Sequence, residues 1–180
     1  MRIYDTSLAD VKLLEPRVIT DGRGFFLESY NQRTFEELGI RETFVQDNHS
    51  RSGRGVLRGL HYQLVQPQGK LVRAVRGEIF DVAVDLRRSS STFGLWTGHL
   101  LSEENKHMLW IPAGFGHGFL VLSPVAEVLY KTTDFYAPQG ERTVMWNDTE
   151  IGIQWPNVGA PVLSVKDAAG KSLRDAEVFA

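Results

Sequence analysis

The chain has 180 residues, a length suited to a single domain with a sizeable hydrophobic core. Its 20 Lys and Arg residues nearly balance its 22 Asp and Glu residues, so the net charge of −2 gives no general attraction to nucleic acid or to an anionic membrane. The absence of cysteine excludes disulfides, a thiolate nucleophile and cysteine-ligated metal sites.

The N-terminal segment MRIYDTSLADVKLLEP carries scattered charges and no apolar core of signal-peptide length. No apolar run approaches the roughly 20 residues of a membrane-spanning helix. We therefore expect a cytoplasmic protein. Without an internal repeat or a linker-like segment, residues 1–180 are expected to form one domain.

The predicted elements are mainly short strands. In chain order, a helix is predicted from Gln32 to Leu38, and alternating apolar and polar residues then predict strands in KLVRAVRG, EIFDVAVDL, HMLWIP, HGFLVL and AEVLYKTTDFY. A second short helix is predicted near Lys171 to Ala176. Many short strands separated by Gly, Pro, Asn and Ser favour an all-β sandwich or barrel with small helical additions.

The run EIFDVAVDL shows the alternation most clearly. Its apolar side chains at positions 80, 82, 84 and 86 face one way, and Asp81 and Asp85 face the other. A strand with this pattern is expected to have two distinct faces.

Two segments are similar to the paired motifs of the cupin barrels. In the first, Gly55 precedes His61 by the expected spacing, and Lys70 precedes Gly77 likewise; the second contains Pro112, Gly114 and His117. The resemblance implies a cupin-type jelly-roll β-barrel.

The departures from the cupin motifs change the expected chemistry. Gln63 stands where a metal-binding histidine is usual, and Lys70 stands near the position of the acidic ligand. An ammonium group has no lone pair for a metal and repels it, and His61 and His117 alone make a poor site. We therefore expect a pocket without metal or other cofactor.

A lysine ammonium can still stabilise negative charge that develops on a carbonyl oxygen. His61 beside it could accept a proton near neutral pH, which suggests proton abstraction next to a ketone through an enolate. Inversion also needs an acid on the opposite face, and Tyr130 or Tyr136, six residues apart, would share one side of a regular strand.

A longer series of segments resembles the dTDP-4-dehydrorhamnose 3,5-epimerase family. The series runs through DGRGFFLESYN, FVQDNHSRSGRGVLRGLHYQ, QGKLVRAVRGEIFDVAVDLRRSSSTFG, ENKHMLWIPAGFGHGFLVLS, YKTTDFYAP and WND. The resemblance implies an isomerase that acts on a 4-keto-6-deoxyhexose carried by dTDP, in dTDP-L-rhamnose biosynthesis. Carbons C3 and C5 both flank the ketone, so one base and one enolate stabiliser can serve both centres.

The family resemblance also implies roles for individual residues. His61 matches the general base, Asp167 the carboxylate that orients it and favours its protonated form, Lys70 the lysine near the C4 oxygen, and Tyr130 the general acid. The implied substrate contacts are Arg23, Phe26, Glu28, Gln46, Asn48, Arg58, His117, Tyr136, Glu141 and Lys166. The resemblance further implies a homodimer whose N-terminal strands reach across to the partner.

Some alternatives stay open at this point. A relative could invert only C3 or only C5, a metal-dependent cupin oxygenase would share the barrel, and a non-catalytic module could bind the nucleotide sugar. Thr143 and Val165 depart from the family pattern at positions with no proposed catalytic role. Arg58 and His61 are an odd number of residues apart, so a regular strand would separate them; a bulge at Gly59 could bring both inward.

Overall fold

The computed structural model describes residues 1–180 and consists mainly of β-strands. The strands are β1 (Arg2–Asp5), β2 (Lys12–Glu15), β3 (Val18–Asp21), β4 (Gly24–Leu27), β5 (Gln46–Gly53), β6 (Leu57–Gln63), β7 (Lys70–Arg76), β8 (Glu78–Asp85), β9 (Trp96–Ser102), β10 (Met108–Ile111), β11 (Phe115–Val121), β12 (Val125–Thr132) and β13 (Glu141–Thr143). The helices are α1 (Gln32–Glu37), α2 (Val165–Ala168) and a 3₁₀ turn (Pro138–Gly140).

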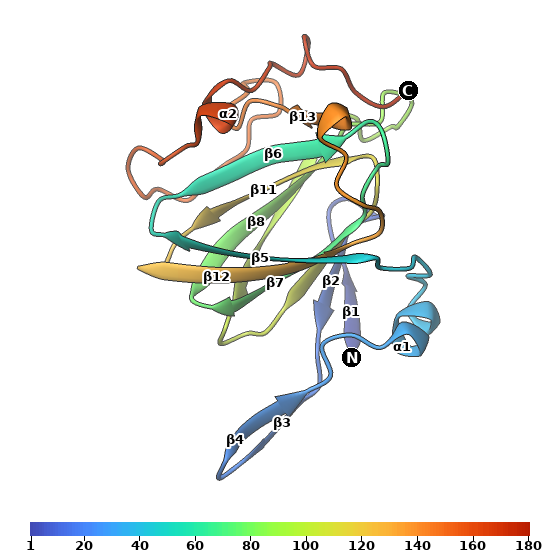
Figure 1. Ribbon diagram of the computed structural model, residues 1–180, viewed down its shortest axis with the longest axis vertical. Helices are drawn as coiled ribbons and strands as arrows, with labels where there is room; N and C mark the ends of the chain where they lie inside the picture. The colour runs from blue at the N-terminus through green and yellow to red at the C-terminus, as the bar shows by residue number, and fades with distance from the viewer.

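Two antiparallel sheets face each other (Figure 1). The larger has the strand order β1-β2-β10-β7-β12-β5, and the smaller has the order β13-β6-β11-β8-β9. Strands adjacent in the sequence are often separated in the sheets, since β11 lies between β6 and β8 while β7 lies between β10 and β12. This exchange of the chain between two sheets is a jelly roll, so the predicted cupin-type barrel is confirmed.

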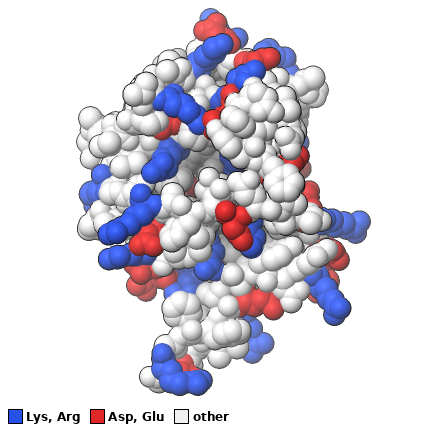
Figure 2. All heavy atoms as spheres, in the orientation of Figure 1, with Lys and Arg blue, Asp and Glu red and all other residues white.

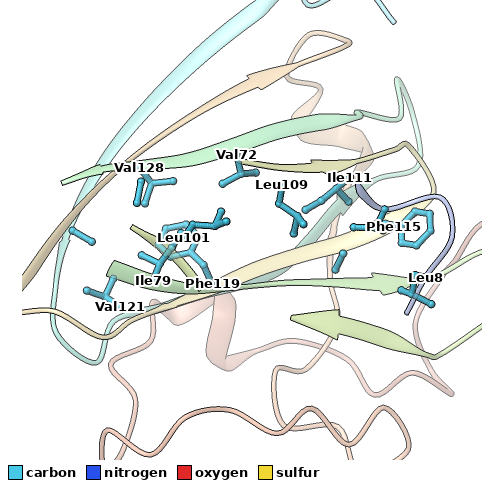
Figure 3. Close-up of a cluster of buried hydrophobic side chains, with 14 residues drawn as sticks. Leu8, Val72, Ile79, Leu101, Leu109, Ile111, Phe115, Phe119, Val121 and Val128 are labelled. Carbon is cyan, nitrogen blue, oxygen red and sulfur yellow. The ribbon is translucent and has the colours of Figure 1, made fainter. Parts of the chain in front are cut away.

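Apolar side chains from both sheets fill the barrel interior (Figure 3). The buried cluster consists of Leu8, Val11, Val72, Ala74, Ile79, Ala83, Leu101, Leu109, Ile111, Phe115, Phe119, Val121, Ala126 and Val128. Its burial contributes the main driving force for folding.

Strand β8 is buried on both faces. Ile79 and Ala83 belong to the interior cluster, while Val82, Val84 and Leu86 pack in a second cluster with residues of the C-terminal segment. The predicted alternation is therefore correct, and the face that carries Asp81 is the one turned into the barrel. A carboxylate in this position needs polar partners inside the protein.

One predicted helix is confirmed and one is wrong. The first is α1, which ends at Glu37, one residue before the predicted end. At its N-terminus, Asn31 caps the helix by accepting a hydrogen bond from Arg33 N at 3.1 Å. Residues 171–176 form turns instead of a helix, because the main-chain nitrogens of Lys171 and Leu173 bond to Thr143 and Asp148 in neighbouring segments. No helix of the protein is long and apolar enough to cross a membrane.

Strand β12 ends at Thr132, earlier than the sequence pattern suggests. Thr132 Oγ1 donates to the carbonyl oxygen of Asp134, and the Asp134 carboxylate accepts from Phe135 N, so the chain turns away from the sheet. The prediction that Tyr130 and Tyr136 lie on one regular strand is therefore wrong.

The β3–β4 hairpin extends away from the barrel (Figure 1). Its aromatic side chains are largely uncovered, with Phe26 68% exposed. Lys106 Nζ lies 4.1 Å from the centre of the Phe25 ring, and this cation–π contact ties the arm to the barrel.

Candidate active site

A cavity of about 410 Å³ lies in the barrel and is lined by side chains from both sheets. It contains all but one of the predicted catalytic residues and most of the predicted substrate contacts. The lining residues are Gln46, Asn48, Ser50, Arg58, His61, Tyr62, Gln63, Gln68, Lys70, His117, Phe119, Tyr130, Tyr136, Glu141 and Lys166.

Asp167 lies directly behind His61, outside the cavity wall. The Nε2 atom of His61 is 2.6 Å from Asp167 Oδ1, and Ser164 Oγ donates to the other carboxylate oxygen at 2.6 Å. Gly59 N also donates to Asp167 at 3.2 Å. Although burial alone would raise it, these hydrogen bonds hold the pKa of Asp167 well below its usual range, so the group is an anion that fixes the orientation of the imidazole.

The environment of His61 favours the neutral ring. Burial is the largest effect and lowers the pKa of His61 below 6.5, although Asp167 alone would raise it; the nearby ammonium groups of Lys166 and Lys70 lower it further. As expected, Asp167 favours the protonated form of this ring, but burial outweighs its contribution to the pKa of His61. No hydrogen bond within the protein engages Nδ1, so this atom can act as a base.

Lys70 begins β7 and is only 7% exposed. Its ammonium donates to the carbonyl oxygen of His61 at 3.1 Å, and the residue lines the cavity rather than facing bulk solvent. Burial lowers the pKa of Lys70 from 10.5 to about 8, so the amine is still mostly protonated at pH 7. A cation in such a dry place interacts strongly with any charge that develops beside it.

Tyr130 approaches the cavity from the opposite sheet. It lies on β12 between Asn48 of β5 and Val72 of β7, whereas His61 lies on β6 of the smaller sheet. Burial raises the pKa of Tyr130, which keeps the phenol protonated and able to donate. The candidate base and the candidate acid thus approach the cavity from different sheets.

A bulge in β6 brings both Arg58 and His61 to the cavity. His117 pairs with His61 and Phe119 pairs with Arg58, so β6 holds one more residue than β11 over this stretch. Gly59 has a φ of +125°, and a Cβ atom there would lie 2.5 Å from Gly118 Cα. The close contact between the strands therefore requires glycine, as the sequence suggested.

Sequence reasoning missed several polar residues of the site. Asp81 is fully buried and accepts from His117 Nε2 at 2.8 Å. Ser50, Gln63 and Gln68 line the cavity itself. The aspartate was visible as the polar position of an otherwise apolar strand, but its partner could not be read without the pairing of β8 with β11.

Glu141 connects two predicted substrate contacts at the edge of the cavity. One carboxylate oxygen pairs with Lys166, and the other accepts from the Tyr136 hydroxyl at 2.9 Å. Although burial alone would raise it, these partners lower the pKa of Glu141. The three residues therefore form one hydrogen-bonded group beside His61.

Three predicted substrate contacts lie away from this cavity. Arg23 pairs with Asp21 at the tip of the β3–β4 hairpin, Phe26 lies on the same arm, and Glu28 follows it and accepts from Asn31. Figure 2 shows acidic and basic side chains mixed over this face of the protein, including the projecting arm. Within one chain, these residues cannot join the cavity residues in a single site.

The cavity contains no cluster of potential metal ligands. His61 and His117 face each other across β6 and β11, but each has its Nε2 atom bonded to a carboxylate. No group of three or more His, Cys, Asp or Glu side chains in the protein could hold a metal ion. The absence of a cofactor stays a prediction.

Comparisons with known proteins agree on one family. The family model described as dTDP-4-dehydrorhamnose 3,5-epimerase matches residues 5–175. A dTDP-4-dehydrorhamnose 3,5-epimerase from Pseudomonas aeruginosa is 64% identical over 180 residues, which covers 99% of each chain.

Solved structures give the same result. The dTDP-6-deoxy-D-glucose-3,5-epimerase from Legionella pneumophila, crystallised with dTDP-4-keto-L-rhamnose, superposes with a TM-score of 0.96 at 51% identity, over 98% of this chain and 94% of that one. A 3′-monoepimerase from Streptomyces bikiniensis, crystallised with dTDP-quinovose, gives 0.89 at 33% identity, over 95% of this chain and 87% of that one. The chain belongs to the dTDP-4-dehydrorhamnose 3,5-epimerase family of carbohydrate epimerases.

Proposed function

We propose that this protein inverts C3 and C5 of dTDP-4-dehydro-6-deoxy-D-glucose and releases dTDP-4-dehydro-β-L-rhamnose. The observation that carries the proposal is the cavity in which a neutral His61, a buried Lys70 ammonium and a protonated Tyr130 meet. Each of the three is in the protonation state that the reaction requires.

The reaction needs two proton transfers at each carbon. His61 removes the proton next to the C4 ketone, and the electron pair of the broken C–H bond moves into an enolate whose oxygen faces Lys70. Tyr130 then donates its hydroxyl proton to the opposite face of the same carbon, and the phenol and imidazole return to their starting states by exchange with solvent. Asp167 holds the ring in place and stabilises the imidazolium that forms.

The remaining polar groups suit a nucleotide diphosphate. Arg58 and Lys166 supply positive charge for phosphate oxygens, and the Arg58 guanidinium can bind them in a bidentate manner. Gln46, Asn48, His117, Tyr136 and Glu141 supply further hydrogen-bonding groups at the cavity wall. Asn48 Nδ2 is buried without a partner in the protein, as expected for a group that bonds to substrate.

The β3–β4 arm supports a homodimer in which Arg23, Phe26 and Glu28 complete the site of the partner. The arm projects from the barrel and exposes aromatic surface that a second copy could cover. The dimer can be tested by mixing an Arg23→Ala variant with a His61→Ala variant. Mixed dimers regain activity if the arm acts in trans, and mixtures stay inactive if it acts within its own chain.

Proton exchange tests the main proposal directly. With the nucleotide sugar in D₂O, NMR should show deuterium entering both C3 and C5 with the wild-type enzyme, and neither with His61→Ala. Deuterium at a single carbon would assign a single-centre epimerase, and no incorporation would refute the proposal.

A further inference from the structure

Gln63 is a buried residue of the cavity wall whose side chain is fully engaged. It ends β6, two residues after His61, and is 4% exposed. Its Nε2 atom donates to the carbonyl oxygens of Gln66 at 2.8 Å and Phe135 at 3.2 Å, and its Oε1 atom accepts from Ala137 N at 3.0 Å. Both amide hydrogens and the amide oxygen therefore have protein partners.

Two more glutamines hold the same segment. Gln68 Nε2 donates to Asp134 O at 2.8 Å, and Gln46 Oε1 accepts from Tyr136 N at 3.1 Å. Together with Gln63, they bond the main chain of residues 134–137, which has left β12 and belongs to no strand. Amide side chains thus replace the hydrogen bonds that a neighbouring strand would supply.

Tyr136 is the side chain that this segment brings to the cavity. It lines the cavity but is 54% exposed, so packing around the ring does not determine its position. Its hydroxyl has a single protein partner, Glu141. The ring is therefore placed mainly by the main chain on either side of it, which Gln63 holds through Phe135 and Ala137.

We propose that Gln63 is a positioning residue of the epimerase: its amide fixes residues 134–137 and so places the Tyr136 ring against the substrate. The inference rests on the proposed function. It adds to the proposed mechanism a residue that touches no reacting atom. Glutamine suits this position because it supplies two donors and an acceptor without charge. A glutamate of the same shape would lack both donors and would add a negative charge to the wall that holds Lys70.

A double-mutant cycle tests the inference through kinetics. Gln63→Met keeps the length of the side chain and removes all three hydrogen bonds, and we expect kcat/KM to fall by about 10- to 100-fold through misplacement of the ring. In a Tyr136→Ala background the ring is absent, so the same substitution should change kcat/KM by roughly threefold or less. Equal losses in the two backgrounds would overturn the inference.

Hydrogen exchange tests the anchoring without reference to activity. In Gln63→Met, the amides of Tyr136 and Ala137 should lose protection while those of β8 keep it, and unchanged protection would overturn the inference. If wild-type enzyme moved no proton in the kinetic assay, the proposed function would fail while this measurement still decided the anchoring. Gln154→Met is the matched control, since Gln154 is exposed and bonds only to Gly152 O; it should leave kinetics and exchange unchanged.

A milder variant covers the case in which Gln63→Met does not fold. Gln68→Met removes one hydrogen bond to the same segment, at a half-buried position. It should loosen the amides of residues 134–137 in the same direction and lower kcat/KM by a smaller factor. Kinetics and exchange identical to those of wild type in this variant would count against the inference.

Discussion

Replacing Lys70 should make the protein more stable and much less active. Burial lowers the pKa of Lys70 from 10.5 to about 8. At 1.36 kcal/mol for each unit of pKa, the folded protein holds the charged amine at a cost of about 3 kcal/mol relative to the unfolded chain. Lys70→Met has a similar length and no charge, so its free energy of unfolding at pH 7 should be higher than that of wild type.

The pH dependence isolates the charge from the change in packing. Below pH 8 the amine is protonated in both the folded and the unfolded protein, and the full cost is present. Between pH 8 and 10.5 the unfolded chain binds the extra proton, so wild-type stability rises with pH relative to the variant. The advantage of Lys70→Met should therefore shrink by about 3 kcal/mol across this range.

Urea denaturation of both proteins from pH 7 to 10.5 measures this difference. The exposed Lys171 provides the control: its side chain buries no charge, so Lys171→Met should not reproduce the gain in stability of Lys70→Met at pH 7. If Lys70 stabilises the enolate as proposed, its loss should lower kcat on the order of 10²- to 10³-fold. A stability difference for Lys70→Met that stays constant with pH would refute the account of a buried, charged amine.

Three further predictions concern the proton transfers. The pH profile of kcat/KM should be bell-shaped, with an acid limb below pH 6.5 where His61 becomes protonated and an alkaline limb near pH 8 where Lys70 loses its proton; a profile rising through pH 9 would contradict this. Asp167→Asn should lower kcat on the order of 10⁴-fold and move the acid limb to lower pH, because Asp167 raises the pKa of His61; steady-state kinetics across pH would detect both, and an unmoved limb would count against the pairing. Tyr130→Phe should still exchange substrate protons with D₂O by NMR but should lose net inversion, and retained inversion would assign the acid elsewhere.

Much of the barrel could be predicted because its strands have local signals. The alternation of apolar and polar residues located β7 and β8, and the cupin-like spacing placed His61 and Lys70 in one pocket. A bulge at Gly59 was predicted because Arg58 and His61 are an odd number of residues apart, and the pairing of β6 with β11 confirms it. Such features depend on residues within a few positions of each other.

The features that the sequence predicted wrongly or did not predict depend on contacts between distant segments. Residues 171–176 have helix-compatible composition, but their main chain bonds to two other segments. The bond between Asp81 and His117 depends on the register of β8 with β11. The role of Gln63 depends on its hydrogen bond to Phe135, which lies more than 70 residues later in the sequence. No periodicity in the sequence reports such pairings.

The arrangement of charge explains how the proposed base and an ammonium can work side by side. Burial lowers the pKa of both His61 and Lys70. For His61 this favours the neutral ring, but for Lys70 it disfavours the charged ammonium. Asp81 and Glu141 oppose this for Lys70, because their negative charges raise its pKa. Asp81 stands behind the wall and accepts from His117, so it supports the ammonium from a side that the substrate does not occupy. The pH range in which His61 is neutral and Lys70 is charged therefore depends on a carboxylate that touches neither His61 nor the sugar. Asp81→Asn should lower the upper pH limit of this range, because it removes a charge that raises the pKa of Lys70.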